Sequence, residues 1–268
     1  MRSLLLSALA AVVLAAAAPA KEVKVLIITG DEVGAHKWKE TAPFIKEVLT
    51  KAGHKVDITQ TPAKDLTPDN LAKYDVLLLN YRNTPQGAKD NPDSVWSDDN
   101  KKAFLDAIKG GKGLYVYHFA SSAFTGKSDF DKEYEKVIAG GWRTQGNHGK
   151  KHEFAVTVRK EHPITMGMKE FKHGPDELYQ NSVMLPSSIV LFTAYSDKEK
   201  DPKNTGKHEP VVWVASYGKG RVVNNVLGHD VEAMKSSEGF QAVLIRGVEW
   251  AGTGEVFYKL PDGLKEDK

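Results

Sequence analysis

The sequence predicts an α/β domain built on a mainly parallel sheet, and three observations support this prediction. Two runs, VKVLIIT at 23–29 and DVLLLN at 75–80, are almost continuously apolar, as in strands that are buried on both faces. Apolar residues then recur at helical spacing at 44–52 and at 96–108. With the further strands described below, the order of elements is typical of a doubly wound sheet.

Most of the predicted elements have a boundary signal. Gly30 ends the first strand, and Gly53 lies where the C-terminal cap of the first helix belongs. Ser97 is placed as the N-cap of the second helix, which ends at Gly110-Gly111. The turn Tyr217-Gly218-Lys219-Gly220 predicts a β-hairpin near the C-terminus. The other predicted strands cover 55–59, 113–119, 153–158, 188–194, 210–216 and 221–227, and a last helix covers 239–250.

The first twenty residues have the pattern of a secretory signal peptide. Arg2 precedes an apolar run at 4–18, and Ala18-Pro19-Ala20 offers the small residues that a signal peptidase reads, so cleavage is expected after Ala20. An uncleaved membrane anchor is the alternative, but the run is shorter than the ~20 residues that span a bilayer. We therefore expect residues 1–20 to be removed and residues 21–268 to form a single exported domain. That domain would be periplasmic or extracellular and would not be bound to a membrane.

Composition excludes several classes of partner and chemistry. The chain has 37 basic and 35 acidic residues, interspersed, so nucleic acid is not an expected partner. It contains no cysteine, which rules out disulfides, thiolate metal sites and every cysteine nucleophile. There is no G-x-G-x-x-G after the first strand, so a dinucleotide-dependent redox enzyme is the weakest option.

Polar side chains follow four of the predicted strands, and three of these positions bring a histidine. In an open α/β sheet, ligands bind at the carboxyl ends of the strands, so these residues are candidates for one site. They are His36 and Trp38 after the first strand, Tyr81 after 75–80, His118 at the end of 113–119, and His229 and Asp230 after 221–227.

A glycine-rich polar loop, GGWRTQGNHGKKH at 140–152, adds further candidates. It is too polar for a core segment and predicts a functional loop. Its candidates for substrate binding are Trp142, Arg143 and Gln145, and its histidines are His148 and His152.

Proton transfer and metal binding are the two roles predicted for the ionisable candidates. Glu177 is the predicted general acid or base, with its pKa raised by the neighbouring Asp176 if both are buried. Imidazoles and a carboxylate are also ligands for Zn²⁺ or a similar divalent ion. The predicted ligands are His118, His148, His152 and His229, with Glu177 as a further possibility.

Each of these residues has a plainer interpretation. His118 could be a core histidine with satisfied hydrogen bonds, and Asp230 could cap the helix that follows His229. Glu177 could belong to a surface ion pair.

An ordered set of short motifs resembles the ThuA-like (trehalose utilisation) family over residues 23–252. The motifs are Thr29-Gly30, His36-x-Trp38, Tyr74-Asp75-Val76, Gly110-Gly111-Lys112-Gly113-Leu114 with His118, His162-Pro163-Ile164-Thr165, Asp176-Glu177-Leu178-Tyr179, Tyr217-Gly218-Lys219-Gly220-Arg221-Val222, Gly228-His229-Asp230 and Glu249-Trp250-Ala251.

The resemblance implies a three-layer flavodoxin-like fold of the class I glutamine amidotransferase type. Amidotransferases of that superfamily carry a cysteine at the turn between a strand and a helix, where this chain has His118. Amidotransferase chemistry is therefore excluded. The family name implies carbohydrate metabolism, and the family is tied to the use of disaccharides, including routes through 3-keto sugars.

Two functions follow from the residues and the resemblance together. The leading one is an exported enzyme that hydrolyses, eliminates from or isomerises a sugar or 3-keto-glycoside, with His118, Glu177 and His229 transferring protons or holding a metal. Direct glycoside hydrolysis usually needs two placed carboxylates, and only one is evident. The alternative is a non-catalytic protein that binds a small carbohydrate or acts as a scaffold.

Overall fold

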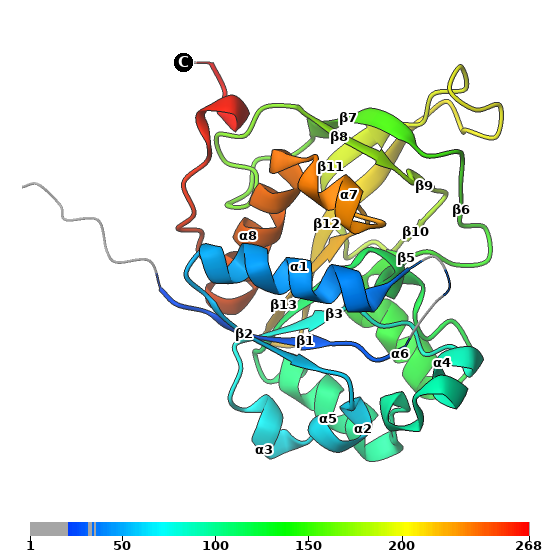
Figure 1. The fold of residues 1–268 in the computed structure, drawn as a ribbon, viewed down its shortest axis with the longest axis vertical. Coiled ribbons are helices and arrows are strands. Elements are labelled where there is room, and N and C mark those ends of the chain that lie inside the picture. The colour runs from blue at the N-terminus through cyan, green and yellow to red at the C-terminus, as the bar shows by residue number, and fades with distance from the viewer. Residues whose placement is uncertain (1–20, 32–33, 35, 268) are drawn as a thin grey trace, which may run out of the picture.

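The computed structural model describes residues 21–31, 34 and 36–267, and the predicted signal peptide lies outside these residues. Within them, nine strands form one sheet in the order β2-β1-β3-β4-β13-β12-β11-β7-β8 (Figure 1). These strands are β1 (Lys24–Ile28), β2 (Lys55–Thr59), β3 (Val76–Leu79), β4 (Gly113–Tyr117), β7 (His152–Val158), β8 (Phe171–Asp176), β11 (Ile189–Tyr195), β12 (His208–Tyr217) and β13 (Gly220–Asn225).

The sheet has a parallel part and an antiparallel extension. Strands β2, β1, β3, β4 and β13 run parallel. Strands β12, β11, β7 and β8 continue the sheet with antiparallel pairs. The predicted hairpin is confirmed, since β12 and β13 pair directly and Gly218 takes a positive φ of 59° in their turn. The predicted α/β class with a mixed, largely parallel sheet is thus correct.

Helices cover both faces of the parallel part, which gives three layers (Figure 1). Val25 and Ile27 of β1 face the core that α1 and α8 close, while Leu26 and Ile28 face the core that α5 and α6 close. Alternate side chains of β1 therefore pack into two different hydrophobic cores, which explains the nearly continuous apolar sequence of this strand. The helices are α1 (Trp38–Lys51), α2 (Pro62–Asp65), α3 (Pro68–Leu71), α4 (Pro85–Asp90), α5 (Asp98–Lys109), α6 (Asp129–Ile138), α7 (Val231–Lys235) and α8 (Glu238–Thr253).

Several predicted boundaries are confirmed in detail. Ser97 caps α5 in a capping box with Asn100, and Gly53 follows α1 with a φ of 93°. The strand predicted at 113–119 ends earlier, at Tyr117, so His118 starts the 3-10 helix η2 (His118–Ser122). Among the described residues, no helix combines the length and the apolar character that crossing a membrane requires.

Four short strands lie outside the main sheet and hold the loop at 140–152 in place. They pair as β5 (Gly140–Gly141) with β10 (Val183–Met184), and β6 (Asn147–His148) with β9 (Tyr179–Gln180). The second pair sets His148 opposite Tyr179, and so brings the glycine-rich loop against the segment that follows β8.

Candidate functional site

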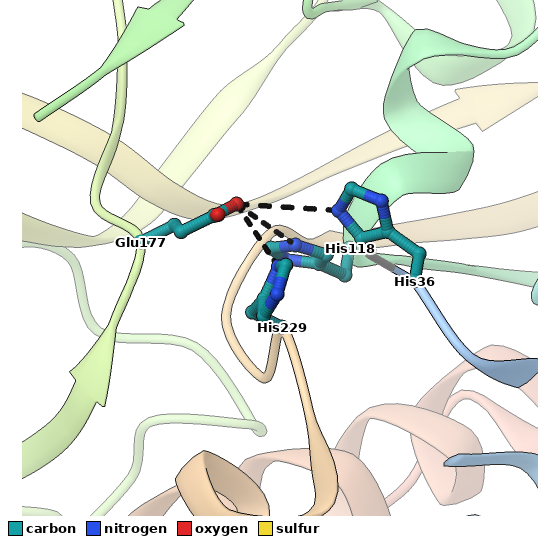
Figure 2. Close-up of side chains that lie close together, drawn as sticks. All are labelled: His36, His118, Glu177 and His229. Carbon is teal, nitrogen blue, oxygen red and sulfur yellow. Dashed lines mark ion pairs between the residues drawn. The ribbon is translucent and has the colours of Figure 1, made fainter. Parts of the chain in front are cut away.

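Three histidines and one glutamate converge from four distant segments of the chain (Figure 2). His36 precedes α1, His118 follows β4, Glu177 follows β8 and His229 lies in the loop after β13. One nitrogen of each ring and one oxygen of the carboxylate lie within 4.8 Å of one another. We refer to these four residues as the His3Glu cluster. It lies where the carboxyl ends of β4 and β13 meet, as expected for an open α/β sheet.

The carboxylate of Glu177 is the centre of the cluster. Its Oε2 atom lies 3.0 Å from Nδ1 of His229 and 4.0 Å from Nε2 of both His36 and His118 (Figure 2). Its other oxygen, Oε1, lies 3.7 Å from Nε2 of His148. The side chain of Glu177 is 12% exposed and that of His148 is 39% exposed, so Oε1 faces the more open side of the site.

The backbone and the hydrogen bonds of His118 fix its ring. Nδ1 lies 2.7 Å from the carbonyl oxygen of Val226. A carbonyl only accepts, so Nδ1 carries the hydrogen and Nε2 presents its lone pair to the cluster. Burial lowers the pKa of His118 to about 4, against the opposing charge of Asp176, so the ring is neutral at pH 7. Its φ of 42° is the left-handed conformation that non-glycine residues adopt at a cost of ~1–3 kcal/mol, often at functional sites.

His229 is positioned through its backbone and leaves its ring available. Its N–H donates to Oδ1 of the buried Asp176 at 3.1 Å. Its Nδ1 atom is buried and, among the described residues, has no hydrogen-bond partner, although Oε2 of Glu177 is 3.0 Å away. The distance suits a hydrogen bond but the direction does not, because a ring N–H lies in the plane of the ring. We therefore treat this contact as electrostatic.

The pKa of Glu177 moves in the direction opposite to the prediction. Burial raises it, but the contact with His229 and the approach of the other histidine rings to the carboxylate outweigh burial, and the pKa is lowered. The neighbouring Asp176 does not act as expected, because its carboxylate is occupied by His173 Nε2 at 2.6 Å and by the backbone of Gly228 and His229. Glu177 is therefore ionised at neutral pH.

Tyr179 belongs to the site through its hydroxyl, whereas the sequence suggested it only as an aromatic residue beside two carboxylates that could pack against a sugar. Its hydroxyl lies 3.0 Å from Nε2 of His118 and 3.4 Å from Nε2 of His36. Burial raises its pKa well above 10, so the hydroxyl keeps its proton and donates. Trp142 packs edge-on against this ring, with centroids 4.5 Å apart, which places one predicted substrate-binding residue beside the cluster.

Three predicted site residues lie elsewhere. His152 is outside the cluster, because its Nδ1 meets the carbonyl of Lys150 and its ring packs against Phe154 on the same strand. Tyr81 is a core residue, since it stacks on Trp96 and donates its hydroxyl hydrogen to the carbonyl of Ser94. Trp38 is only 6% exposed at the start of α1, which leaves too little surface to stack on a sugar.

The remaining predicted substrate-binding residues have structural roles or stay at the surface. Asp230 caps α7 by accepting from the N–H of Ala233, so the plainer interpretation of this residue is confirmed. Arg143 donates to the carbonyls of Ser121 and Trp142, which ties the 140–152 loop to η2. Gln145 is exposed within that loop.

A cavity in another part of the fold does not coincide with the cluster. It measures about 520 Å³ and is lined by residues such as Leu71, Asp75 and Gly111. Asp75 and Gly111 precede β3 and β4, so this cavity lies at the amino ends of the strands, opposite the histidines. Its walls bring together no set of histidines and carboxylates, and we assign the chemistry to the His3Glu cluster.

The cluster combines a base, an acid and a set of metal donors. Ionised Glu177 can accept a proton, and the protonated hydroxyl of Tyr179 can donate one. Three imidazoles with a carboxylate are also the donor types that Zn²⁺ prefers.

Comparisons with known proteins identify the family and the fold. Residues 24–251 match the family model ThuA, described as trehalose utilisation. A ThuA-like protein from Parabacteroides merdae has a crystal structure with a TM-score of 0.76 and 29% identity, covering 91% of this chain and 95% of that chain. A second from Bacteroides uniformis gives a TM-score of 0.64 and 21% identity over 91% of this chain and 98% of that one. Part of a β-galactosidase from Rahnella sp. R3, 31% of that chain, shares the fold with 85% of this chain at a TM-score of 0.54 and 13% identity. No curated protein matches the sequence.

Proposed function

This chain belongs to the ThuA family of trehalose utilisation, and from that premise we propose that it is an exported enzyme that eliminates the aglycone from a 3-keto-glycoside. The observation that supports this proposal is the position of Glu177 and Tyr179. A carboxylate and a phenol hydroxyl both approach His118, the first at 4.0 Å and the second at 3.0 Å. The pair supplies a base and an acid within one small site.

The chemistry of a keto-sugar suits this pair. A carbonyl at C3 acidifies the hydrogen on C2, so one carboxylate can remove it without a second catalytic carboxylate. The electrons of the C2–H bond form the C1=C2 double bond, and the C1–O bond breaks to release the aglycone. Tyr179 is placed to donate a hydrogen bond to an oxygen that gains charge, either the enolate or the leaving group. Glu177 takes the proton.

The surroundings support a carbohydrate ligand. Trp142 is half-buried beside Tyr179 and offers an aromatic face next to the cluster. His148, on the more exposed side of Glu177, is placed to meet a substrate hydroxyl or to relay the proton from Oε1. Export is part of the proposal because the first twenty residues have the pattern of a signal peptide.

A chromogenic 3-keto-glycoside tests the proposal directly. With p-nitrophenyl 3-keto-glucoside, the wild-type protein is expected to release p-nitrophenol, and the parent p-nitrophenyl glucoside, which lacks the acidifying carbonyl, should stay intact. Glu177→Gln is expected to lower kcat by ~10²–10⁴-fold, as loss of a general base does. The matched control is Glu153→Gln, which removes an exposed carboxylate from β7 and should leave kcat unchanged.

Two results would contradict the proposal. Wild-type protein that binds the keto-glycoside but releases no p-nitrophenol would indicate a carbohydrate-binding protein instead of an enzyme. Equal loss of activity in Glu177→Gln and Glu153→Gln would remove Glu177 from the reaction.

A further inference from the structure

The His3Glu cluster has the donor set of a metal centre. Three imidazole nitrogens and one carboxylate oxygen come within 4.8 Å of one another, from segments that are far apart in the sequence. In Figure 2 the rings of His36, His118 and His229 group on one side of the Glu177 carboxylate, and they contact one another with ring centroids 4.6–5.4 Å apart. His118 and His229 are buried and His36 and Glu177 are partly buried, so the donors are withdrawn from bulk solvent.

The ring of His118 is held in the form that binds a metal ion. Its Nδ1 hydrogen is bonded to the carbonyl oxygen of Val226, which leaves the lone pair of Nε2 directed into the cluster. Histidines that bind metals characteristically donate their other ring hydrogen to a carbonyl or carboxylate in this way. In the arrangement described here the hydroxyl of Tyr179 lies 3.0 Å from this Nε2, so an incoming ion would take over that lone pair.

His229 gives an independent indication. A buried ring nitrogen without a hydrogen bond costs ~1–3 kcal/mol, and proteins rarely leave one without a reason. Nδ1 of His229 is such an atom among the described residues, while its backbone is fixed by Asp176. Coordination of an ion at this nitrogen would satisfy it.

The size of the cluster fits an ion of the zinc type. Around a tetrahedral ion with bonds of 2.0–2.2 Å, neighbouring ligand atoms lie about 3.3–3.6 Å apart. The distances from Oε2 of Glu177 to the three nitrogens are 3.0, 4.0 and 4.0 Å. The widest separation, within 4.8 Å, requires side chains to close by about 1 Å, which small rotations of His36 and Glu177 can supply.

We propose that His36, His118 and His229, together with Oε2 of Glu177, bind one divalent transition-metal ion, with Zn²⁺ as the best fit. This set differs from the one the sequence predicts, since His36 replaces His148 and His152. His148 lies beside Oε1 of Glu177, outside the set, and supports that carboxylate. Near a keto-sugar, such an ion would polarise the C3 carbonyl. The inference goes beyond the proposed reaction, because ion binding is measurable with or without turnover.

Ion binding is tested on mature protein made without a histidine tag. The protein is stripped with a chelator, reloaded with ZnCl2, dialysed and measured by elemental analysis, and affinity is measured by competition with a zinc-binding dye. The wild type is expected to hold close to one ion per chain. His36→Asn and His229→Asn should each weaken Zn²⁺ binding by more than ~100-fold. Loss of a group that only supports a metal ligand already lowers metal affinity 10- to 100-fold.

The matched controls are His152→Asn and His148→Asn, which change histidines outside the set. The first should bind Zn²⁺ as the wild type does, and the second should bind it within about tenfold of the wild-type affinity. Circular dichroism and the unfolding midpoint of the stripped proteins show whether each variant folds. Zn²⁺ should raise that midpoint for the wild type and for His152→Asn. It should raise the midpoint of His36→Asn only slightly or not at all.

The proposal is overturned if the reloaded wild type holds only a trace of zinc, or if His36→Asn and His229→Asn bind as tightly as His152→Asn. These outcomes are separate from the test with the 3-keto-glycoside. A metal-free protein that releases p-nitrophenol would support the proposed reaction and contradict the metal site. A zinc-binding protein that releases none would support the metal site and contradict the reaction.

Discussion

The carboxylate of Asp176 accepts a hydrogen bond from the backbone nitrogen of His229, 3.1 Å away. The other oxygen of the carboxylate accepts the N–H of Gly228 at 2.6 Å and lies 2.6 Å from Nε2 of His173. Asp176 and His173 are completely buried. The end of β8 thereby holds the loop after β13. The position of the His229 ring therefore depends on the Asp176 carboxylate, which is itself fixed by His173 and Gly228.

Replacing this carboxylate is expected to loosen the site and destabilise the fold. Asp176→Asn removes a buried charge that several donors face, and breaking a buried pair costs ~3–5 kcal/mol. The free energy of unfolding in urea should fall by about 3 kcal/mol. Asp230→Asn is the control, because Asn caps a helix as well as Asp, and it should cost less than ~1 kcal/mol. Equal losses in the two variants would show that Asp176 does not hold the loop.

The left-handed backbone at His118 predicts an unusual order of stability between two variants. Both His118→Gly and His118→Ala remove the ring and leave the same space. At a φ of 42° glycine is unstrained, whereas the Cβ of alanine adds a steric strain of ~1–2 kcal/mol in the left-handed region. We therefore expect His118→Gly to unfold at higher urea concentration than His118→Ala. The reverse order, which holds in ordinary helix and strand positions, would mean that the backbone there does not keep a positive φ.

The hydroxyl of Tyr179 is expected to matter for turnover and little for folding. Tyr179→Phe keeps the ring against Trp142 and removes only the donor near His118 and His36. With the chromogenic 3-keto-glycoside, kcat should fall by ~10²-fold or more while KM changes little. Tyr217→Phe removes a hydroxyl that donates to Glu133 and serves as the control. A Tyr179→Phe enzyme with wild-type kcat would exclude the hydroxyl as the acid.

His162 predicts a measurable loss of stability in acid. Burial, with the nearby charge of Lys160, lowers its pKa to about 4 from the ordinary 6.5. Nδ1 accepts the N–H of Ile164 at 3.2 Å, which only a neutral ring can do. Since the unfolded chain binds the proton more readily, this contribution is complete above pH 6.5 and is lost as pH falls towards 4.

A substitution isolates this effect. In His162→Asn the amide oxygen can accept from Ile164 and does not titrate. Between about pH 7 and about pH 4.5 the wild type should lose about 1 kcal/mol more stability than the variant, a figure reduced for the partial exposure of the ring. Urea unfolding at both pH values measures the difference. Parallel pH profiles for the two proteins would show that His162 is not held neutral.

The apolar pattern predicted most of the sheet because burial dictates it. The runs at 23–29 and 75–80 became β1 and β3, and KVDIT became β2 without change. Strand β8 was not predicted, since its sequence FKHGPD contains glycine and proline. Proline is tolerated there because β8 is an edge strand, whose outer N–H groups need no partner in the sheet. Helix α6 was also missed, although Ser128 caps it.

Residues of the site could be predicted from the sequence only where they come directly after a strand. His118 and His229 were identified because each lies just beyond a parallel strand, a rule that depends on topology alone. His36 was identified as a binding residue, but its approach to Glu177 depends on how the segment before α1 returns over the sheet. His148 and His152 are four residues apart, a spacing that shares a face only in a helix, and the neighbouring glycines already argue against a helix there. The chain instead forms β6 and β7 there, which sends the two rings in different directions.

The hairpin between β12 and β13 also determines when the cluster can exist. His229 follows β13, the second strand of this hairpin, and Glu177 follows β8 at the far edge of the sheet. A growing chain that has made His36 and His118 has two of the four donors, Glu177 adds the third, and the set is complete only once His229 has been synthesised. Tight ion binding can therefore report that folding is complete, because early fragments lack the donors to compete for the metal.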